Sequence, residues 1–265
     1  MIRRLGLAFA VVLLIAGAVF LGCAQSGQHS EKTRHKTSAT IKNDSVGKGA
    51  ASSQRYEHLT DADFEKVARQ LEVETAAIKA VVSIEAGSAM KGFWAPGVPI
   101  INFDPTMYRK YAPKALDKAG DKNAKVPAGL TGYALREWTQ LTNARKNNLQ
   151  GADMGTFWGM FQIGGFNYKV CGCKSVEEFV RRMSHSELEQ LELFAEFLVG
   201  TGYVRDLRAK NWSSFARKYN GPSYAKRGYH TKMASAYSKF KSQESKNKKA
   251  PVPDGKLAGK ELKLN

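Results

Sequence analysis

The sequence predicts an all-α fold for the stretch from Tyr56 to Phe240, and three observations favour it. Apolar residues recur with a period near 3.6 from Thr60 onward, and no stretch alternates apolar and polar residues as a half-buried strand would. Ser, Thr and Asn stand at the starts of the periodic stretches, where such residues cap helices. The chain of 265 residues is 43% hydrophobic, which is enough to bury a core. We therefore expect one helical domain without internal repeats.

The periodic stretches give the expected helices in chain order. Thr60, followed by two aspartates in the first turn, begins the first helix. The second helix covers residues 75–86 and the third covers residues 130–145. Asn211 caps a short helix further along the chain, and residues 230–240 form the last one.

Two further helices are predicted from capping boxes, in which a Ser is followed three residues later by a Glu. Ser175 with Glu178 begins one of them, and Ser184 with Glu187 begins the other. Leucines and an alanine recur in helical phase after the second box. A glycine, Gly200, is expected to end that helix.

Lys-rich flanks on both sides of the domain carry much of the positive charge. The chain has 41 Lys and Arg against 24 Asp and Glu, a formal charge of +17. Residues 24–55 and 241–265 each carry +4 and few large apolar residues, so we predict that both are disordered. Residues 56–240 keep only +7. This excess is typical of proteins with a polyanionic partner, such as nucleic acid, an anionic membrane face or a cell-wall polymer.

Residues 1–23 have the layout of an export signal, with two arginines before an apolar run over residues 5–21. The run ends in Phe20-Leu21-Gly22-Cys23, which resembles a bacterial lipobox with Cys23 as the acylated residue. Plain secretion and an uncleaved anchor are the alternatives. All three place the protein outside the cytoplasm, which argues against nucleic acid as the partner. We expect a lipid-anchored envelope protein, on the periplasmic side of the outer membrane.

Glu85 is the first candidate for chemistry, because it continues an apolar stripe. Ile78, Val81 and Val82 define the buried face of the second helix, and Glu85 occupies the next position on it. Burial and the negative end of the helix dipole both disfavour its charge and raise its pKa. A carboxyl group kept protonated in this way can act as the general acid in glycoside cleavage. The alternative is a Glu at the edge of the stripe, in solvent or paired with an Arg.

Three motifs then follow one another along the chain: Glu85-Ala86-Gly87-Ser88, Gly159-Met160-Phe161-Gln162-Ile163 and Tyr219-Asn220-Gly221. Together they resemble the lysozyme-like superfamily. More narrowly, they resemble the N-acetylmuramidase family of phage endolysins and bacterial cell-wall proteins. The resemblance spans Leu59 to Tyr237.

The resemblance implies a lysozyme-like helical domain with a substrate cleft that binds peptidoglycan. It implies hydrolysis of the β-1,4 bond between N-acetylmuramic acid and N-acetylglucosamine, with Glu85 as the acid. Sugar contacts are implied for Gln162, for the backbone around Met160 and Phe161, and for Tyr219 and Asn220. Trp158 offers either a surface for a sugar face or a core side chain.

The second carboxylate is less clear than the first. Family members usually carry an Ile-Leu-Phe-Glu-Arg-His-like segment, where this chain has Ile101-Asn102-Phe103-Asp104-Pro105-Thr106. Asp104 is the candidate for a base or electrostatic partner, and a cap or turn residue before Pro105 is its alternative. Asp153 is a second candidate. A lytic transglycosylase, which needs only the single Glu, and a non-catalytic wall-binding lipoprotein are the competing functions.

Cys171 and Cys173 invite a metal or disulfide interpretation, but neither is favoured. Two thiols without nearby His or Cys partners make a poor zinc site, and a disulfide across one residue is strained. We expect free or loosely oxidised thiols. No cofactor motif occurs in the sequence, and a monomer is expected.

Overall fold

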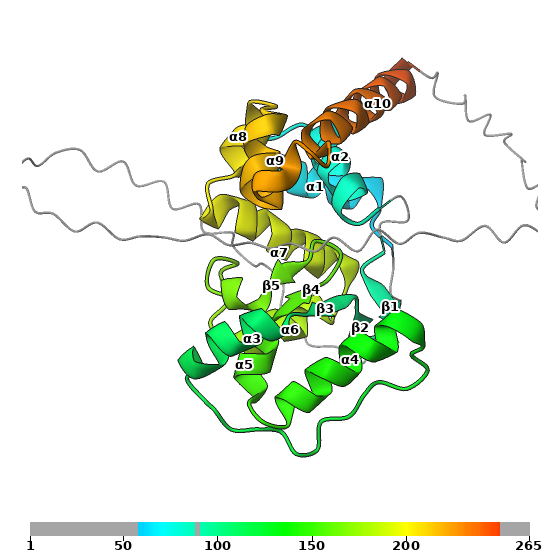
Figure 1. Ribbon diagram of the computed structural model, residues 1–265. Helices are drawn as coiled ribbons and strands as arrows, with labels where there is room; N and C mark the ends of the chain where they lie inside the picture. Colours follow the sequence, from blue (N-terminus) through cyan, green and yellow to red (C-terminus); the bar gives the residue numbers. More distant parts are fainter. Residues whose placement is uncertain (1–57, 88–90, 250–265) are drawn as a thin grey trace, which may run out of the picture. The chain divides into compact units, whose positions relative to one another are not determined.

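The computed structural model describes residues 58–87 and 91–249 of the chain, which form one compact unit (Figure 1). The predicted signal, Cys23 and the 24–55 tether lie outside the described residues, as does the tail from residue 250 onward. Within the described ranges, no helix combines the length and the apolar character needed to cross a membrane.

Helices make up most of the described chain, which confirms the predicted helical fold. The α-helices are α1 (Asp61–Leu71), α2 (Thr75–Glu85), α3 (Pro105–Tyr111), α4 (Gly132–Arg145), α5 (Leu149–Met154), α6 (Val176–Met183), α7 (Glu187–Gly200), α8 (Val204–Arg208), α9 (Trp212–Asn220) and α10 (Tyr229–Lys249). Short 3₁₀ turns are η1 (Ala112–Lys114), η2 (Gly165–Asn167) and η3 (Pro222–Tyr224).

Short strands that the sequence did not predict join these helices. They are β1 (Phe93–Ala95), β2 (Val98–Pro99), β3 (Ile101–Phe103), β4 (Thr156–Trp158) and β5 (Ile163–Gly164). β1 and β2 form a hairpin, and β3, β4 and β5 form an antiparallel sheet in that order. Strands of two or three residues are too short to show an alternating pattern, so the periodicity could not reveal them.

Most of the predicted helix starts are confirmed. Thr60 and Asp63 form a capping box at the start of α1. Ser175 caps α6 and Asn211 caps α9. Each of these side-chain oxygens accepts a hydrogen bond from a backbone N–H in the first turn, which otherwise has no partner within the helix.

The predicted capping box of Ser184 with Glu187 is wrong. Ser184 closes α6, where its N–H donates to carbonyls of the last turn. The cap of α7 is Ser186, whose hydroxyl accepts from the N–H of Glu189 at 3.1 Å. The segment contains two overlapping Ser-x-x-Glu patterns, and the preceding helix occupies the first serine.

The last helix, α10, continues beyond Phe240 to Lys249, so the first part of the predicted disordered tail is helical. Contacts with Glu74 hold this extension. The carboxylate of Glu74 accepts from Tyr237 Oη at 2.9 Å and from Lys241 Nζ at 2.5 Å. Lys241 and Glu74 are 167 residues apart in the sequence, so the local pattern around Lys241 could not predict this contact.

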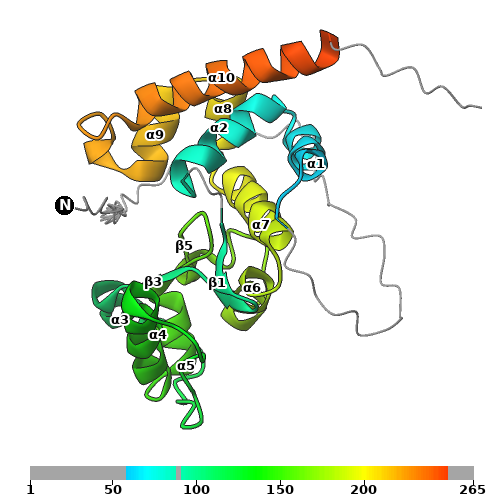
Figure 2. The same cartoon turned by 90° about the vertical axis from the view of Figure 1, so that its right-hand side faces the viewer.

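The core centres on α2, whose apolar side chains are almost completely buried (Ala76, Ala77, Ile78, Ala80, Val81 and Val82). α10 packs along α2 and also contacts α9. In both views, α9 and α10 lie at one end of the domain and α3, α4 and α5 at the other, with α7 between them (Figures 1 and 2). This packing brings the ends of α2 and α9 together.

Candidate active site

Glu85 is the last residue of α2 and remains half-buried. Burial raises the pKa of its carboxyl group to about 7, and a hydrogen bond from Asn220 opposes part of that rise. A Glu with a pKa near 7 is protonated over much of the acidic to neutral range. The structure therefore gives Glu85 the property that the sequence predicted for it.

Asn220 is the last residue of α9 and only 6% of it is exposed. Its Nδ2 donates to Oε1 of Glu85 at 2.9 Å. The next residue, Gly221, has a φ of +78°, a backbone conformation that favours glycine and lets the chain leave the helix here. Oδ1 of Asn220 is buried and has no hydrogen-bond partner within the described part of the chain.

Tyr219 links α9 to the loop between β4 and β5. Its hydroxyl donates to the carbonyl of Phe161 at 2.8 Å. Its ring stacks on Phe215 at 5.5 Å between centroids and meets Phe194 edge-on at 5.7 Å. Burial, with a smaller effect of the Glu85 charge, raises the pKa of Tyr219 well above its ordinary value. The phenol therefore stays neutral and acts as a donor to the loop.

The loop between β4 and β5 covers residues 159–162, called the loop of Gly159 below, and two of its residues have a positive φ. Gly159 has a φ of +70° and Gln162 a φ of +49°, and such a value is uncommon for a residue with a side chain. The side chain of Gln162 donates from Nε2 to the carbonyl of Gly159 at 2.9 Å, closing the loop on itself. Outliers of this kind cluster at functional sites.

Gln190 on α7 holds this loop in place, and the sequence analysis did not identify it. Its Oε1 accepts from the N–H of Met160 at 2.9 Å, and its Nε2 donates to the carbonyls of Gly92 and Met183. A Cβ on Gly159 would lie 2.7 Å from Gln190 Oε1 and would displace the amide that binds Met160. The φ of +70° at Gly159 also favours glycine there. The available signal was a polar residue beside Leu191 on the apolar face of a helix.

A neighbouring carboxylate, Glu187, works beside Gln190 and was also missed as a contributor. Its Oε1 accepts from the N–H of Gly92 at 2.9 Å, and its Oε2 accepts from the N–H of Leu59. Together the two side chains fasten α7 to the segment that follows Glu85 and to the loop of Gly159.

Besides Asn220, three of the predicted sugar-contacting positions are buried. Trp158 is fully buried and donates from its indole to the carbonyl of Asp153. Of its two predicted roles, the structure therefore supports that of a core side chain. Met160 and Phe161 are 2% and 1% exposed. The N–H of Met160 binds Gln190, and the carbonyl of Phe161 binds Tyr219. Those two backbone groups therefore shape the loop.

The two candidate second carboxylates both have structural partners. Asp104 caps α3, where its Oδ1 accepts from the N–H groups of Thr106 at 2.7 Å and Met107 at 3.0 Å. Asp153 is 2% exposed and pairs with Arg145 at 2.7 Å. Burial raises the pKa of Asp153, and the Arg145 charge opposes that rise. Neither carboxylate is hydrogen-bonded to Glu85 or Asn220 in the contacts described.

Comparison with known proteins agrees with this arrangement. The N-acetylmuramidase family matches residues 74–241, a range that contains Glu85, the loop of Gly159 and Asn220. The chain belongs to the N-acetylmuramidase family. Members of this family are peptidoglycan hydrolases, and peptidoglycan is the substrate that membership implies.

A solved structure supports the same assignment. The crystal structure of the Burkholderia AP3 phage endolysin is similar with a TM-score of 0.60 and 36% sequence identity. The match covers 71% of this chain and 72% of the endolysin. No curated protein matches the chain.

The two cysteines in the described part of this N-acetylmuramidase family member, Cys171 and Cys173, are free thiols. Cys171 and Cys173 are buried and form no disulfide. Burial raises the pKa of both thiols, that of Cys173 to about 11. Thiols that resist ionisation in this way are poor nucleophiles, so the pair is part of the core.

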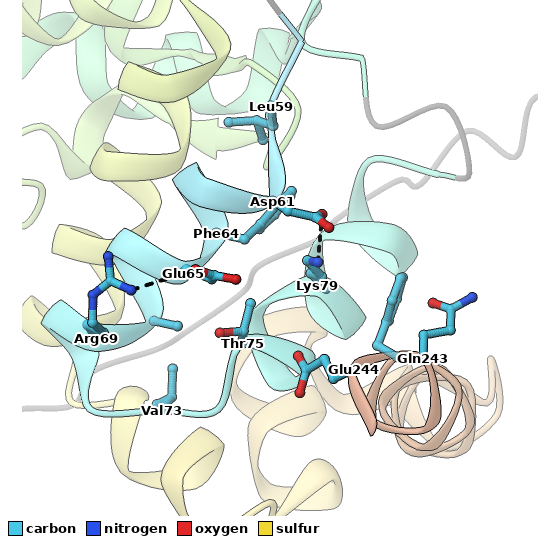
Figure 3. A pocket seen from close by; sticks show the side chains of 12 residues that line it. Leu59, Asp61, Phe64, Glu65, Arg69, Val73, Thr75, Lys79, Gln243 and Glu244 are labelled. Carbon is cyan, nitrogen blue, oxygen red and sulfur yellow. Dashed lines mark hydrogen bonds and ion pairs between the residues drawn. The ribbon is translucent and has the colours of Figure 1, made fainter. Parts of the chain in front are cut away.

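A separate groove of about 830 Å³ lies between α1, the first half of α2 and the outer part of α10 (Figure 3). Two ion pairs are found on its walls, Lys79 with Asp61 at 2.7 Å and Arg69 with Glu65 at 3.8 Å. Neither Glu85 nor any other predicted site residue lines it. The site around Glu85 is therefore distinct from this groove.

Proposed function

We propose that the chain cleaves the β-1,4 bond between N-acetylmuramic acid and N-acetylglucosamine, with Glu85 as the general acid. The observation that carries the proposal is the half-buried carboxyl group of Glu85, with its pKa near 7, hydrogen-bonded to Asn220. Protonated Glu85 donates its proton to the leaving glycosidic oxygen as the glycosidic bond breaks, which avoids expulsion of an unstabilised alkoxide. The carboxylate that remains then takes a proton from the water whose oxygen adds to the glycosyl carbon, which returns Glu85 to its acid form. The Asn220 bond fixes one carboxyl oxygen, so that the other carries the proton.

Asn220 has a second role in this proposal. Because its Nδ2 donates to Glu85, its Oδ1 is an acceptor, and that buried acceptor has no protein partner among the described residues. A buried acceptor without a partner is unfavourable until a donor arrives. We assign this donor to the substrate or to the attacking water. Gln162 closes the loop of Gly159 through its side-chain amide. We assign to the same amide a hydrogen bond with the bound sugar.

A lytic transglycosylase is the second candidate, and the structural roles of Asp104 and Asp153 favour it. An inverting hydrolase needs a base about 6.5–9.5 Å from the acid, and a retaining one needs a nucleophile at about 5–5.5 Å. Asp104 caps α3 and Asp153 pairs with Arg145. The pKa of Glu85 is set by burial and Asn220, whereas a carboxylate at nucleophile distance would raise it further. A transglycosylase uses one Glu as acid and then as base.

The masses of the products distinguish the two reactions. Purified peptidoglycan is digested with the protein and with Glu85→Gln, and the soluble fragments are weighed by mass spectrometry. Reducing muramic acid ends, absent with the variant, support hydrolysis. Anhydro-muramic ends, lighter by one water, support the transglycosylase. Wall binding without any released fragment would rule out both and leave the non-catalytic wall-binding lipoprotein.

We also propose that the protein is a monomer held at the outer membrane, facing the periplasm, by acylation of Cys23. The support is the lipobox-like Phe20-Leu21-Gly22-Cys23 after an apolar run. The basic stretch of residues 24–55 would then serve as a tether to the wall. Detergent partition and the mass of the mature N-terminus test this proposal. Cys23→Ser should move the protein to the aqueous phase, and an unchanged partition would contradict acylation.

A further inference from the structure

A cluster of three half-buried side chains, Trp94, Asn102 and Tyr133, and one exposed side chain, Arg136, joins β1, β3 and α4. Trp94 comes from β1, Asn102 from β3, and Tyr133 and Arg136 from the first turns of α4. The rings of Trp94 and Tyr133 meet edge-on at 6.0 Å, and Asn102 Nδ2 donates to Tyr133 Oη at 3.0 Å. The guanidinium of Arg136 lies 4.7 Å from the centre of the Tyr133 ring. We call these four residues the aromatic platform.

The backbone beneath the aromatic platform is held rigidly by α4. Glu137, only 5% exposed, accepts from the N–H of Phe103 at 3.0 Å and so fixes β3 beside Asn102. The indole of Trp138 donates to the carbonyl of Pro99 at 3.3 Å and fixes β2. Binding sites need side chains held by such supports, and a cluster that served only to fill space would not need to retain exposed polar groups.

The aromatic platform is connected to the proposed catalytic loop through adjacent backbone. Asn102 is paired with Phe157 on β4, and β4 runs directly into Gly159. The N–H of Gly159 donates to the carbonyl of Ile100 at 2.8 Å, and the N–H of Ile100 donates to the carbonyl of Gly92 at 2.9 Å. Trp94 is therefore two residues from Gly92, and Gly92 is bonded to Ile100, the residue that is bonded to Gly159 in the loop. Glu85, the last residue of α2, precedes Gly92 in the chain.

The chemistry of the aromatic platform fits an N-acetylated sugar that carries a carboxylate. Aromatic rings present apolar faces for a sugar ring, and Tyr and Trp are suited to surfaces with one apolar and one wet side. An Asn supplies amide groups for hydroxyls or acetamido groups. The Arg136 side chain is 60% exposed, and its Nε donates to Oε1 of Glu137 at 3.3 Å. A guanidinium group has five N–H donors, so Arg136 can keep this bond and still bind a carboxylate of the substrate.

We propose that Trp94, Asn102, Tyr133 and Arg136 bind the glycan strand at a muramic acid unit outside the scissile bond. This inference rests on the proposed function and adds a substrate contact to it. The Trp94 and Tyr133 rings hold the sugar, and Arg136 pairs with the carboxylate of its lactyl group or attached peptide. The proposal gives a role to the contact between the exposed guanidinium of Arg136 and the ring of Tyr133.

Binding to Glu85→Gln protein tests the aromatic platform without depending on catalysis. Soluble peptidoglycan fragments are titrated calorimetrically, and chitooligosaccharides, which lack the carboxylate, serve as the comparison. Adding Trp94→Ala should weaken binding of both ligands about tenfold. Adding Arg136→Gln should weaken only the peptidoglycan fragments, by about fivefold. The matched control is Trp212→Ala. Trp212 is a half-buried residue of α9 whose ring lies 5.5 Å from that of Tyr237 on α10, away from the four residues of the platform. This substitution should change neither affinity.

The outcomes separate the aromatic platform from the catalytic proposal. Unchanged affinity for both ligands in the Trp94 and Arg136 variants would overturn the platform while leaving Glu85 untouched. If Trp94→Ala unfolds, the exposed Arg136 variant still decides, because equal weakening of the two ligands, or none, contradicts the proposal. In the catalytically intact protein, Trp94→Ala should raise KM with kcat within about twofold, since binding outside the scissile bond is uniform. Loss of kcat alone would also contradict it.

Discussion

The carboxamide of Asn220 donates to Oε1 of Glu85 at 2.9 Å and so joins the last residue of α9 to the last residue of α2. This bond lowers the pKa of Glu85, against burial, which raises it to about 7. The pKa of the proposed acid is thus set by two opposing effects. The effect of the Asn220 hydrogen bond can be removed by a single substitution.

Asn220→Leu should shift the descending limb of the pH–rate profile upward. The variant keeps the site apolar but loses the hydrogen bond that favours the ionised carboxyl group. In the parent protein, kcat/KM should fall as the pH rises through about 7. The pH dependence of kcat/KM is measured for both proteins. Tyr219→Phe is the control, because it lowers the rate through the loop and should leave the midpoint unchanged; a downward shift in Asn220→Leu would contradict the assignment.

Glu85→Gln should stabilise the protein above pH 7 more than it does near pH 4. The folded pKa of Glu85 is raised from 4.5 to about 7, so its favourable contribution is complete below the unfolded value and is lost as the pH rises through the folded one. A neutral Gln avoids that loss, giving a gain of about 1–3 kcal/mol at pH 8. Urea unfolding at both pH values measures it, and a difference independent of pH would be inconsistent with a buried, ionising Glu85.

Asp104 should behave as a helix cap. Asn is an equally good cap, so Asp104→Asn should keep activity within about twofold, whereas Asp104→Ala should lower the free energy of unfolding by about 1 kcal/mol. Peptidoglycan turnover and thermal unfolding are measured side by side. A loss of about a hundredfold or more in Asp104→Asn would identify Asp104 as the catalytic base and favour hydrolysis with two carboxylates over the transglycosylase reaction.

Glu74 should make the protein sensitive to acid. Hydrogen bonds from Lys210 and Lys241 lower its pKa from 4.5 to about 2. The folded pKa is depressed, so this contribution is present above pH 4.5 and is lost as the pH falls toward 2. Because Glu74 is partly exposed, Glu74→Gln should cost only about 1 kcal/mol at pH 7. At pH 2 the variant and the parent should unfold alike, and a gap that persisted there would refute an electrostatic origin.

The sequence predicted the helical fold and the family because both leave local marks. Caps such as Thr60, Ser175 and Asn211 act within one turn of their own helix, so a few residues suffice to recognise them. The resemblance to N-acetylmuramidases rested on motifs in order along the chain, and the family match over residues 74–241 confirmed it. Glu85 was identified because a carboxyl group on an apolar stripe conflicts with the local pattern.

Features that depend on distant contacts could not be predicted in the same way. Gln190 positions the loop of Gly159 through bonds to residues far away in sequence. Its place beside Leu191 on the apolar face of α7 marks it as unusual but does not identify those partners. α10 extends past Phe240 because Lys241 reaches Glu74. Trp158 was an ambiguous aromatic residue until the sheet placed it inside the core. In each case the deciding partner lies outside the reach of the local pattern.

The most direct test of the account is the rate at which Glu85→Gln releases fragments from purified peptidoglycan at pH 5.5. At that pH the parent carboxyl group is protonated, and Gln preserves the shape and the acceptor for Asn220 while removing the proton that is transferred. The account predicts a folded variant that binds peptidoglycan with the affinity of the parent and releases fragments at least about a hundredfold more slowly. Release within tenfold of the parent rate, by a folded variant, would contradict Glu85 as the acid.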